Sequence, residues 1–333
     1  MILVTGGTGL VGAHLLYKLV ISNKKVKAIY RNECKLNNVK SVFTYYTKDY
    51  EALYNSIEWI EADILDIPNL SEAFKNVTHV YHCAAFVSFE PDKYQLLRQT
   101  NIEGTANIVN LSISNAVKKL CYVSSIATLG KTLNNKPVTE NTNWNPEADN
   151  NVYAITKYGA EMEVWRGTQE GLDAVIVNPG VILGAGIWRY GTGNLFKKAH
   201  KGLKYYTSGS IALIAVEDVV DIMVKLMNSS IINERFVLVA ENWTSKDFLQ
   251  ILAKSVNAKP PKKLASMLLL KIAWRLDWLK HKLTGKRRQL TKHLVQSLST
   301  ETNYNSNKIK ETLNYKFKPI KETILAIGNQ YLK

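Results

Sequence analysis

The stretch Thr5-Gly6-Gly7-Thr8-Gly9-Leu10-Val11-Gly12 stands between a short apolar run, residues 2–5, and a helical run, residues 12–22. Gly6 would permit a tight turn, Gly9 would let backbone approach a pyrophosphate, and Gly12 would allow close helix–strand contact. The start of a helix also offers unpaired N–H groups and its positive dipole end to phosphate oxygens. The stretch therefore predicts a dinucleotide site formed by Gly6, Thr8, Gly9, Leu10, Val11 and Gly12.

Apolar runs and helical runs alternate through the first half of the chain. We expect strands at residues 2–5, 26–30, 57–61, 79–82, 120–124 and 175–178, and helices at residues 12–22, 69–76, 101–115 and 151–170. Strands separated by helices of this length join through right-handed crossovers and form a parallel sheet. The pattern predicts an α/β fold, a doubly wound parallel sheet of the Rossmann type with helices on both faces.

The regular alternation ends near residue 183, and several glycines punctuate the region beyond it. A helix at residues 217–227 and a strand at residues 235–240 are the regular elements expected next. We therefore divide the chain into two domains. Residues 1–183, completed by parts of 215–240, form the dinucleotide-binding domain, and residues 184–333 form a smaller α+β domain that mainly binds substrate.

The composition is ordinary for a soluble chain, with 333 residues, 46% hydrophobic and 21% charged. Cys34, Cys83 and Cys121 are far apart and make no Cys-x-x-Cys pair, which argues against a disulfide framework and a structural zinc site. We expect no bound metal. The sequence shows no basic leader with a cleavage site and no apolar run of membrane-spanning length, so we expect a cytoplasmic protein.

The end of the second expected strand carries Tyr30 followed by Arg31. In a Rossmann unit an acid at this place binds the adenosine 2′-hydroxyl, whereas an arginine accommodates a 2′-phosphate. Because there is no acid and a guanidinium suits bidentate phosphate contact, NADP is favoured over NAD, unless Arg31 is simply a solvated surface residue. Asp63, after the third strand, could accept a hydrogen bond from the adenine amine.

Tyr153 and Lys157 are four residues apart, which places both side chains on one face of an expected helix. A tyrosine with a pKa of about 10 is a poor base at neutral pH, but a nearby ammonium and an oxidised nicotinamide would favour the phenolate. Such a pair occurs by chance in many helices. Ser124 and Ser125 strengthen it, because they end a strand at the sheet edge where ligands bind, and a hydroxyl there can orient a substrate oxygen toward Tyr153.

The ordered motifs resemble those of the extended short-chain dehydrogenase/reductases, the NAD(P)-dependent epimerase/dehydratase family. The likeness covers nearly the whole chain and rests on Thr5-Gly-Gly-Thr-Gly-Leu-Val-Gly12, Asp63, His82-Cys-Ala-Ala85, Asn101-Ile-Glu-Gly-Thr105, Tyr122-Val-Ser-Ser-Ile126, Tyr153-x-x-x-Lys157, Asn178-Pro-Gly180 and Tyr304-Asn-Ser-Asn-Lys308. It implies that Ser125, in preference to Ser124, acts with Tyr153 as acid/base and with Lys157. Asn101 would support the active-site strand and a solvent relay. The resemblance also implies a small-molecule substrate, a homodimer as one expected assembly, and cofactor contacts from Ile64, Ala84, Ala85, Pro179 and Val181.

Within this family the residues after the catalytic hydroxyl indicate the branch. Sugar-nucleotide dehydratases carry an Asp-Glu pair where this chain has Ile126 and Ala127, and sugar-nucleotide members tend to have Asn-x-Tyr-Gly-Pro in place of Val181-Ile-Leu-Gly184. Arg31 and the Ser-Ser-Ile run resemble dihydroflavonol reductases and 3β-hydroxysteroid dehydrogenases. We therefore expect hydride transfer between nicotinamide and a secondary alcohol or ketone. A sugar-nucleotide epimerase or dehydratase is the alternative, and a non-catalytic NADP-binding protein is a second alternative.

The net charge of +15 is concentrated near the C-terminal end. Residues 259–293 hold eleven Lys or Arg residues and one acid, a net +10. Within 264–283, leucine and isoleucine recur at helical spacing beside basic residues and tryptophans, which is typical of a helix resting on anionic lipid. The other interpretation, which we favour, is a lid helix packed on the substrate domain. Nucleic-acid binding is not expected, because no recognition motif accompanies the charge.

Overall fold

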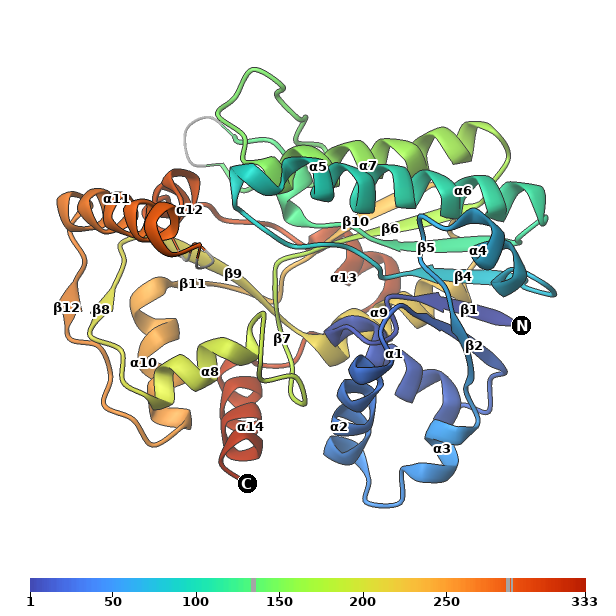
Figure 1. The fold of residues 1–333 in the computed structure, drawn as a ribbon, viewed down its shortest axis with the longest axis horizontal. Helices are drawn as coiled ribbons and strands as arrows, with labels where there is room; N and C mark the ends of the chain where they lie inside the picture. The colour runs from blue at the N-terminus through green and yellow to red at the C-terminus, as the bar shows by residue number, and fades with distance from the viewer. Residues whose placement is uncertain (133–135, 286–287, 289) are drawn as a thin grey trace.

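The computed structural model describes residues 1–132, 136–285, 288 and 290–333. Within them, the central sheet has seven strands in the order β10-β6-β5-β4-β1-β2-β3, and all neighbouring strands are parallel (Figure 1). The strands are β1 (Ile2–Thr5), β2 (Val26–Tyr30), β3 (Glu58–Glu61), β4 (His79–His82), β5 (Lys119–Val123), β6 (Ala174–Pro179) and β10 (Glu234–Leu238). The strand order reverses between β1 and β4, which is where ligands bind in sheets of this kind. The predicted Rossmann architecture is confirmed.

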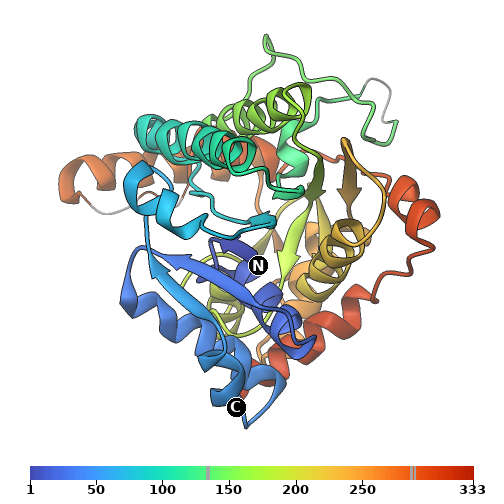
Figure 2. The same cartoon turned by 90° about the vertical axis from the view of Figure 1, so that its right-hand side faces the viewer.

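Helices cover both faces of this sheet, because its inner strands are apolar on both sides. One face carries α1 (Leu10–Ile21), α2 (Leu36–Tyr46), α3 (Glu51–Asn55) and α9 (Val216–Met227). The other carries α4 (Ile67–Ala73), α6 (Gly104–Ser114) and α7 (Val152–Gln169), with α5 (Tyr94–Leu97) packed against α7. Figures 1 and 2 both show α6 and α7 together on one side of the sheet. Along the chain, α2 and α3 come after β2 and before β3, in a segment where the sequence pattern predicts no element.

A smaller layer lies beside the carboxyl ends of the main strands. Its three-stranded sheet has the order β11-β9-β7 and is formed by β7 (Val181–Leu183), β9 (Ser210–Ala215) and β11 (Glu241–Thr244). Around it pack α8 (Gly193–His200), α10 (Ser245–Ser255) and α14 (Ile320–Leu332). A short pair, β8 (Tyr205–Tyr206) and β12 (Lys263–Leu264), extends this part of the molecule.

Chain segments from the C-terminal half return to the main sheet. Strand β10 pairs with β6, and α13 (Asn307–Leu313) packs against β10. Strand β7, in contrast, leaves the main sheet and pairs with β9. The chain therefore passes back and forth between the two parts. The predicted division stays a proposal: one domain of residues 1–183 with parts of 215–240, and a second of residues 184–333.

The basic segment forms α11 (Met267–Thr284), followed by α12 (Lys292–Ser297). Ser266 caps α11 by accepting from the backbone N–H of Leu269 at 3.2 Å, and Gly285 ends the helix with φ 64°. Of the side chains on α11, Leu270 is buried, against α12. Leu268 and Leu283 are 70% and 76% exposed, so our preferred interpretation of a helix packed by its apolar face on the substrate domain is wrong. None of the described helices is long and apolar enough to cross a membrane.

Candidate active site

The glycine loop has the geometry that its sequence predicts. Gly6 has φ 67°, and a Cβ there would lie 2.6 Å from the backbone nitrogen of Ala84. A Cβ on Gly12 would lie 2.2 Å from the Gly6 carbonyl oxygen. At Gly9, whose N–H donates to that carbonyl at 2.9 Å, a Cβ would meet only the same oxygen, at 3.3 Å. The loop is therefore held tight against the sheet and is open on the side of Gly9, at the start of α1, where Thr8, Leu10 and Val11 are partly exposed.

The other residues predicted to contact a dinucleotide also lie at the carboxyl ends of strands. Arg31 follows β2 and Asp63 follows β3, and their side chains form an ion pair of 3.2 Å with exposed fractions of 50% and 34%. Ile64, beyond Asp63, is buried. The positions that complete this edge are Ala84 and Ala85 after β4, Pro179 at the end of β6 and Val181 at the start of β7. The structure thus brings these predicted contacts to one sheet edge, and the Arg31–Asp63 pair is an addition to the contacts that the sequence indicates.

Ser125 and Tyr153 meet across this edge. Ser125 follows β5 and caps the short turn Ile126–Thr128, where its hydroxyl accepts from the backbone N–H of Ala127 at 3.1 Å. Tyr153 lies in the first turn of α7, which Asn151 caps. Burial raises the pKa of Tyr153, and a hydrogen bond with Ser125 opposes that rise in pKa. The rise in pKa from burial disfavours the phenolate and favours the neutral hydroxyl of Tyr153.

Lys157 lies one turn further along α7 and is 1% exposed. Its ammonium donates to the Tyr122 hydroxyl at 2.5 Å and to the Val123 carbonyl at 2.9 Å. Burial lowers the pKa of Lys157 to about 7, and the charge of Glu161 partly opposes this by raising it. The lysine is therefore poised to exchange a proton near neutral pH.

Glu161 is the centre of a buried polar cluster that sequence reasoning missed. Its side chain is fully buried and accepts hydrogen bonds from Ser124 at 2.5 Å, Thr128 at 2.8 Å, Asn178 at 2.8 Å and Arg235 at 2.9 Å. These donors come from the ends of β5 and β6, from the turn after Ser125 and from β10. The spacing of Tyr153, Lys157 and Glu161, four residues each time, was the signal in the sequence. The cluster ties the turn that presents Ser125 to α7.

A second buried set connects Lys157 with the strand that leads to the glycine loop. Tyr122, which accepts from Lys157, is hydrogen-bonded to Thr105. The ring of His82 is hydrogen-bonded to Thr105 at 2.9 Å and to Thr5 at 2.6 Å. Burial, and then the charge of Lys157, lower the pKa of His82 to about 3, so the ring is neutral. The set therefore holds β1, β4, β5 and α6 in register behind the site without adding charge.

Asn101 belongs to a π-helical turn, Arg98–Glu103, rather than to a regular helix over residues 101–115. Its side chain accepts from the backbone N–H of Phe86 at 2.8 Å, and donates to the Phe86 carbonyl at 3.0 Å and to Thr156 at 3.2 Å. Turns of this type often occur at functional sites. The contacts join the loop after β4 to the face of α7 next to Lys157, and a role in a solvent relay stays a prediction.

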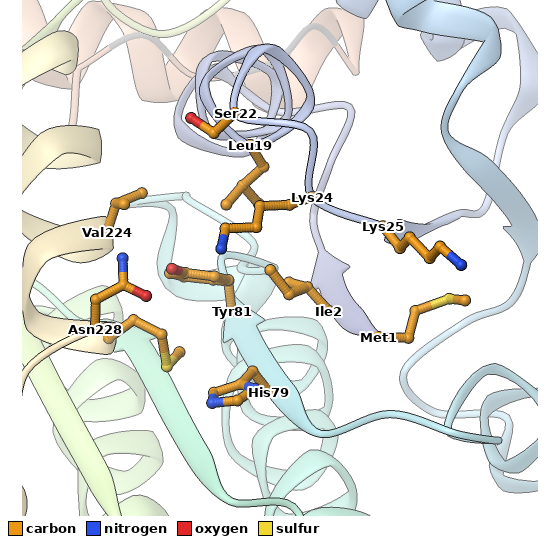
Figure 3. A pocket seen from close by; sticks show the side chains of 11 residues that line it. Met1, Ile2, Leu19, Ser22, Lys24, Lys25, His79, Tyr81, Val224 and Asn228 are labelled. Carbon is orange, nitrogen blue, oxygen red and sulfur yellow. The ribbon is translucent and has the colours of Figure 1, made fainter.

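A hollow shown in Figure 3 lies at the other end of the sheet. Met1 precedes β1, Ile2 begins it and His79 begins β4, so the hollow faces the amino ends of the strands. Lys24, Tyr81 and Asn228 are among the other side chains that line it. None of the predicted site residues lines this hollow, and it is distinct from the edge that carries Ser125 and Tyr153.

Comparisons with known proteins identify the family to which the chain belongs. Residues 2–238 match the NAD dependent epimerase/dehydratase family. The chain is 27% identical to sterol demethylase protein B of Methylococcus capsulatus over 81% of this chain and 80% of that protein. It is 25% identical to cinnamoyl-CoA reductase 1 of Oryza sativa, over 66% of this chain and 65% of the reductase. The structure of the Bordetella bronchiseptica enzyme WbmG in complex with NAD and UDP has a TM-score of 0.74, with 18% identity over 99% of this chain and 95% of that one.

The last likeness concerns the fold alone, whereas the family match spans more than half of the chain and includes the glycine loop, Ser125, Tyr153 and Lys157. The chain is therefore an enzyme, an NAD(P)-dependent oxidoreductase of the extended short-chain type, and it belongs to the NAD-dependent epimerase/dehydratase family.

Proposed function

We propose that the protein is a reductase or dehydrogenase that interconverts a ketone and a secondary alcohol. The observation that carries this proposal is the contact of Ser125 with Tyr153, one helical turn from Lys157. The glycine cradle at Gly6 and Gly12, which admits no Cβ, fits the pyrophosphate of a nicotinamide dinucleotide. When bound, that cofactor supplies or accepts the hydride.

The side chains of the site have separate tasks in this proposal. Ser125 holds the substrate oxygen by a hydrogen bond and aims it at Tyr153. In the reductive direction Tyr153 donates its phenolic proton to that oxygen, which fits a tyrosine whose pKa lies above its ordinary value. The ammonium of Lys157 stabilises the phenolate that results, and with a pKa of about 7 it can release a proton afterwards.

The substrate that we propose is an apolar ketone or secondary alcohol. The turn after Ser125 contains Ile126 and Ala127, so these positions offer no acidic side chain to assist a dehydration. The ring of Phe89 packs against that of Tyr153 with 5.5 Å between centroids, so that the tyrosine has an aromatic neighbour on the loop after β4. The names of the relatives, a sterol demethylase protein and a cinnamoyl-CoA reductase, agree with an apolar group near the reacting carbon.

We propose NADP as the cofactor, with NAD as the less favoured choice. The support is Arg31 at the end of β2, where half of its side chain is exposed and no acid precedes it. Its partner Asp63 would have to share the guanidinium with a 2′-phosphate. The NAD named with WbmG supports the other choice, since that protein has the same fold.

Two further parts of the proposal concern partners and location. A homodimer could pair through the outer surface of α7, where Ile155 is 38% exposed and Met162 is partly exposed. Sedimentation of the wild type against an Ile155→Glu variant would test this.

Contact of residues 264–283 with a membrane surface is a separate proposal that depends on none of the catalytic residues. Residence in the cytoplasm stays a prediction.

The experiment that tests the reaction measures NADPH consumption with a panel of ketones, for the wild type and a Tyr153→Phe variant. We expect Tyr153→Phe to keep cofactor binding, read by fluorescence, and to lose turnover by about 10²- to 10⁴-fold, as removal of an acid/base group does. Tyr158→Phe on the same helix is the matched control and should keep turnover. Unchanged turnover in Tyr153→Phe would refute the assignment. Cofactor retained through purification, with interconversion of sugar nucleotides and no net NADPH consumption, would instead support the epimerase alternative.

A further inference from the structure

Helix α11 presents an apolar stripe to solvent. Residues three or four apart lie above one another on a helix, and five aliphatic side chains follow this spacing along nearly the whole of α11. The apolar stripe comprises Leu268, Ile272, Leu276, Leu279 and Leu283, which are all between 45% and 76% exposed. In a soluble protein an exposed, contiguous set of large aliphatic side chains indicates a surface that contacts something else.

The opposite side of α11 is the one that packs on the protein. Leu270 is buried and, with Trp274, contacts Val295 and Leu290 in the small cluster that joins α11 to α12. Asp277 accepts from the backbone N–H of Leu290 at 3.0 Å on that side. Figure 1 shows α11 at the outer left edge of the molecule, with α12 beside it. The apolar stripe therefore points away from the body of the protein, and the contacts on the other side fix this orientation.

Basic side chains border the apolar stripe along both edges. With about 100° of rotation per residue, Lys271, Arg275 and Lys282 lie along one edge and Lys280 along the other. All four are exposed. Lys282 lies over the ring of Trp278, 5.4 Å from its centroid, and the same tryptophan is 44% exposed at this edge. The surface of α11 thus has leucines in the middle, lysine and arginine at the margins and a tryptophan at the boundary. This arrangement matches the interface between an apolar layer and an anionic layer.

We propose that α11 docks on the surface of an anionic lipid bilayer, lying in the plane of the membrane with the apolar stripe among the acyl chains. Charge complementarity selects this occupant, because the helix belongs to a segment of net charge +10 and the stripe itself is aliphatic. A second copy of the chain fits poorly, since two such faces would bring their lysines together. A nucleic acid would leave the leucines in water. The helix does not span the membrane, as its Lys and Arg residues keep it at the interface.

This docking would also orient the active site. The backbone N–H of Arg288, between α11 and α12, donates to Glu90 at 3.3 Å, and Glu90 follows Phe89, which packs on Tyr153. His293 on α12 lies 3.6 Å from Asp149, on the loop that leads into α7. The segment that follows α11 is thus joined to both loops beside Tyr153, so docking of α11 would fix the orientation of these loops relative to the membrane surface.

The test is co-sedimentation of the full chain with phosphatidylcholine vesicles that do or do not contain phosphatidylserine. We expect binding to the anionic vesicles, weakened by salt, and little binding to the neutral ones. Each cation removed in Lys271→Gln, Arg275→Gln and Lys282→Gln should weaken binding about fivefold. The triple variant Lys197→Gln/Lys201→Gln/Lys254→Gln, which removes three exposed charges elsewhere, is the control and should bind like the wild type.

A Leu268→Ser/Leu276→Ser/Leu283→Ser variant separates insertion from simple charge attraction. It should lose most of the binding and the blue shift of tryptophan emission that accompanies it, while its melting temperature stays that of the wild type. Equal binding to neutral vesicles, or binding that these serines do not reduce, would overturn the proposal. So would a dimer that this variant abolishes in the absence of lipid, because a second copy would then cover the stripe. Turnover of a water-soluble ketone should be unchanged in all α11 variants, so a failure here leaves the proposed reaction unaffected.

Discussion

The hydroxyl of Ser124 donates a hydrogen bond of 2.5 Å to the buried carboxylate of Glu161, whereas the neighbouring hydroxyl of Ser125 meets Tyr153. Successive residues of an extended strand point to opposite sides, so two adjacent serines cannot share one task. We therefore expect alanine at Ser125 to reduce mainly the catalytic rate and alanine at Ser124 to reduce mainly the stability. Ser125→Ala should lower kcat by about 10²- to 10³-fold, as loss of a donor to the substrate oxygen does. The lost cap on the N–H of Ala127 should cost about 1 kcal/mol in stability.

Ser124→Ala should do the reverse. It removes one of four donors to a buried carboxylate, so we expect a loss of about 1–3 kcal/mol in the free energy of unfolding and a kcat within a fewfold of the wild type. Steady-state kinetics and urea denaturation on both variants provide the check. The assignment would fail if Ser124→Ala were the slow enzyme and Ser125→Ala the unstable one.

The low pKa of Lys157 makes a prediction about stability. Its pKa falls from the ordinary 10.5 to about 7 through burial, so folding favours the neutral amine. Between pH 7 and pH 10.5 the unfolded chain binds more protons than the folded one, and stability contributed by this group rises with pH. The cost of the buried charge is fully present below pH 7. Lys157→Met removes it, and the variant should be inactive yet more stable at pH 6.

The gain should shrink as pH rises, by roughly 2–3 kcal/mol between pH 6 and pH 9, because one unit of pKa shift corresponds to about 1.4 kcal/mol. Urea denaturation of both proteins across this range measures the difference. Lys254→Met, which changes an exposed lysine on α10, is the matched control and should show no such trend. A gain for Lys157→Met that is the same at pH 6 and pH 9 would contradict the assigned burial effect.

The Glu161–Arg235 ion pair supports a third prediction. Glu161→Gln leaves Arg235, which is 19% exposed, without its buried partner, so we expect a loss of about 3–5 kcal/mol in the free energy of unfolding. The double variant Glu161→Gln/Arg235→Met should be less destabilised than the sum of the two single variants. We expect this difference, the coupling energy of a double-mutant cycle, to be about 1–3 kcal/mol. Because Glu161 raises the pKa of Lys157, Glu161→Gln should also lower that pKa, and activity should fall away at a lower pH than in the wild type. Strict additivity of the two substitutions would show that the pair is not coupled.

The parts of this site that could be predicted are those that depend on short spacing along the chain. The glycine loop and the Tyr153–Lys157 pair each lie within one local element, so their geometry follows from a turn or a helix. Glu161 has the same spacing, but its partner Arg235 is 74 residues away and arrives only when β10 joins the sheet. The surroundings of α11 could not be predicted either, because an amphipathic pattern indicates that one face is apolar but does not indicate what covers that face.

The Arg31–Asp63 pair decides the last prediction, which concerns the cofactor. With 3.2 Å between the guanidinium and the carboxylate, and both partly exposed, the pair can open to admit a 2′-phosphate at small cost. Arg31→Asp should weaken NADPH binding by about 10- to 100-fold, since a charge-assisted contact is lost. It should keep or strengthen NADH binding, because an acid at this place can bind the 2′-hydroxyl. Lys24→Asp, at the opposite end of the strands, makes the same change in charge and should leave both affinities unaltered. Fluorescence titration with both cofactors measures the ratio, and an equal effect of Arg31→Asp on NADPH and NADH would remove the basis for preferring NADP.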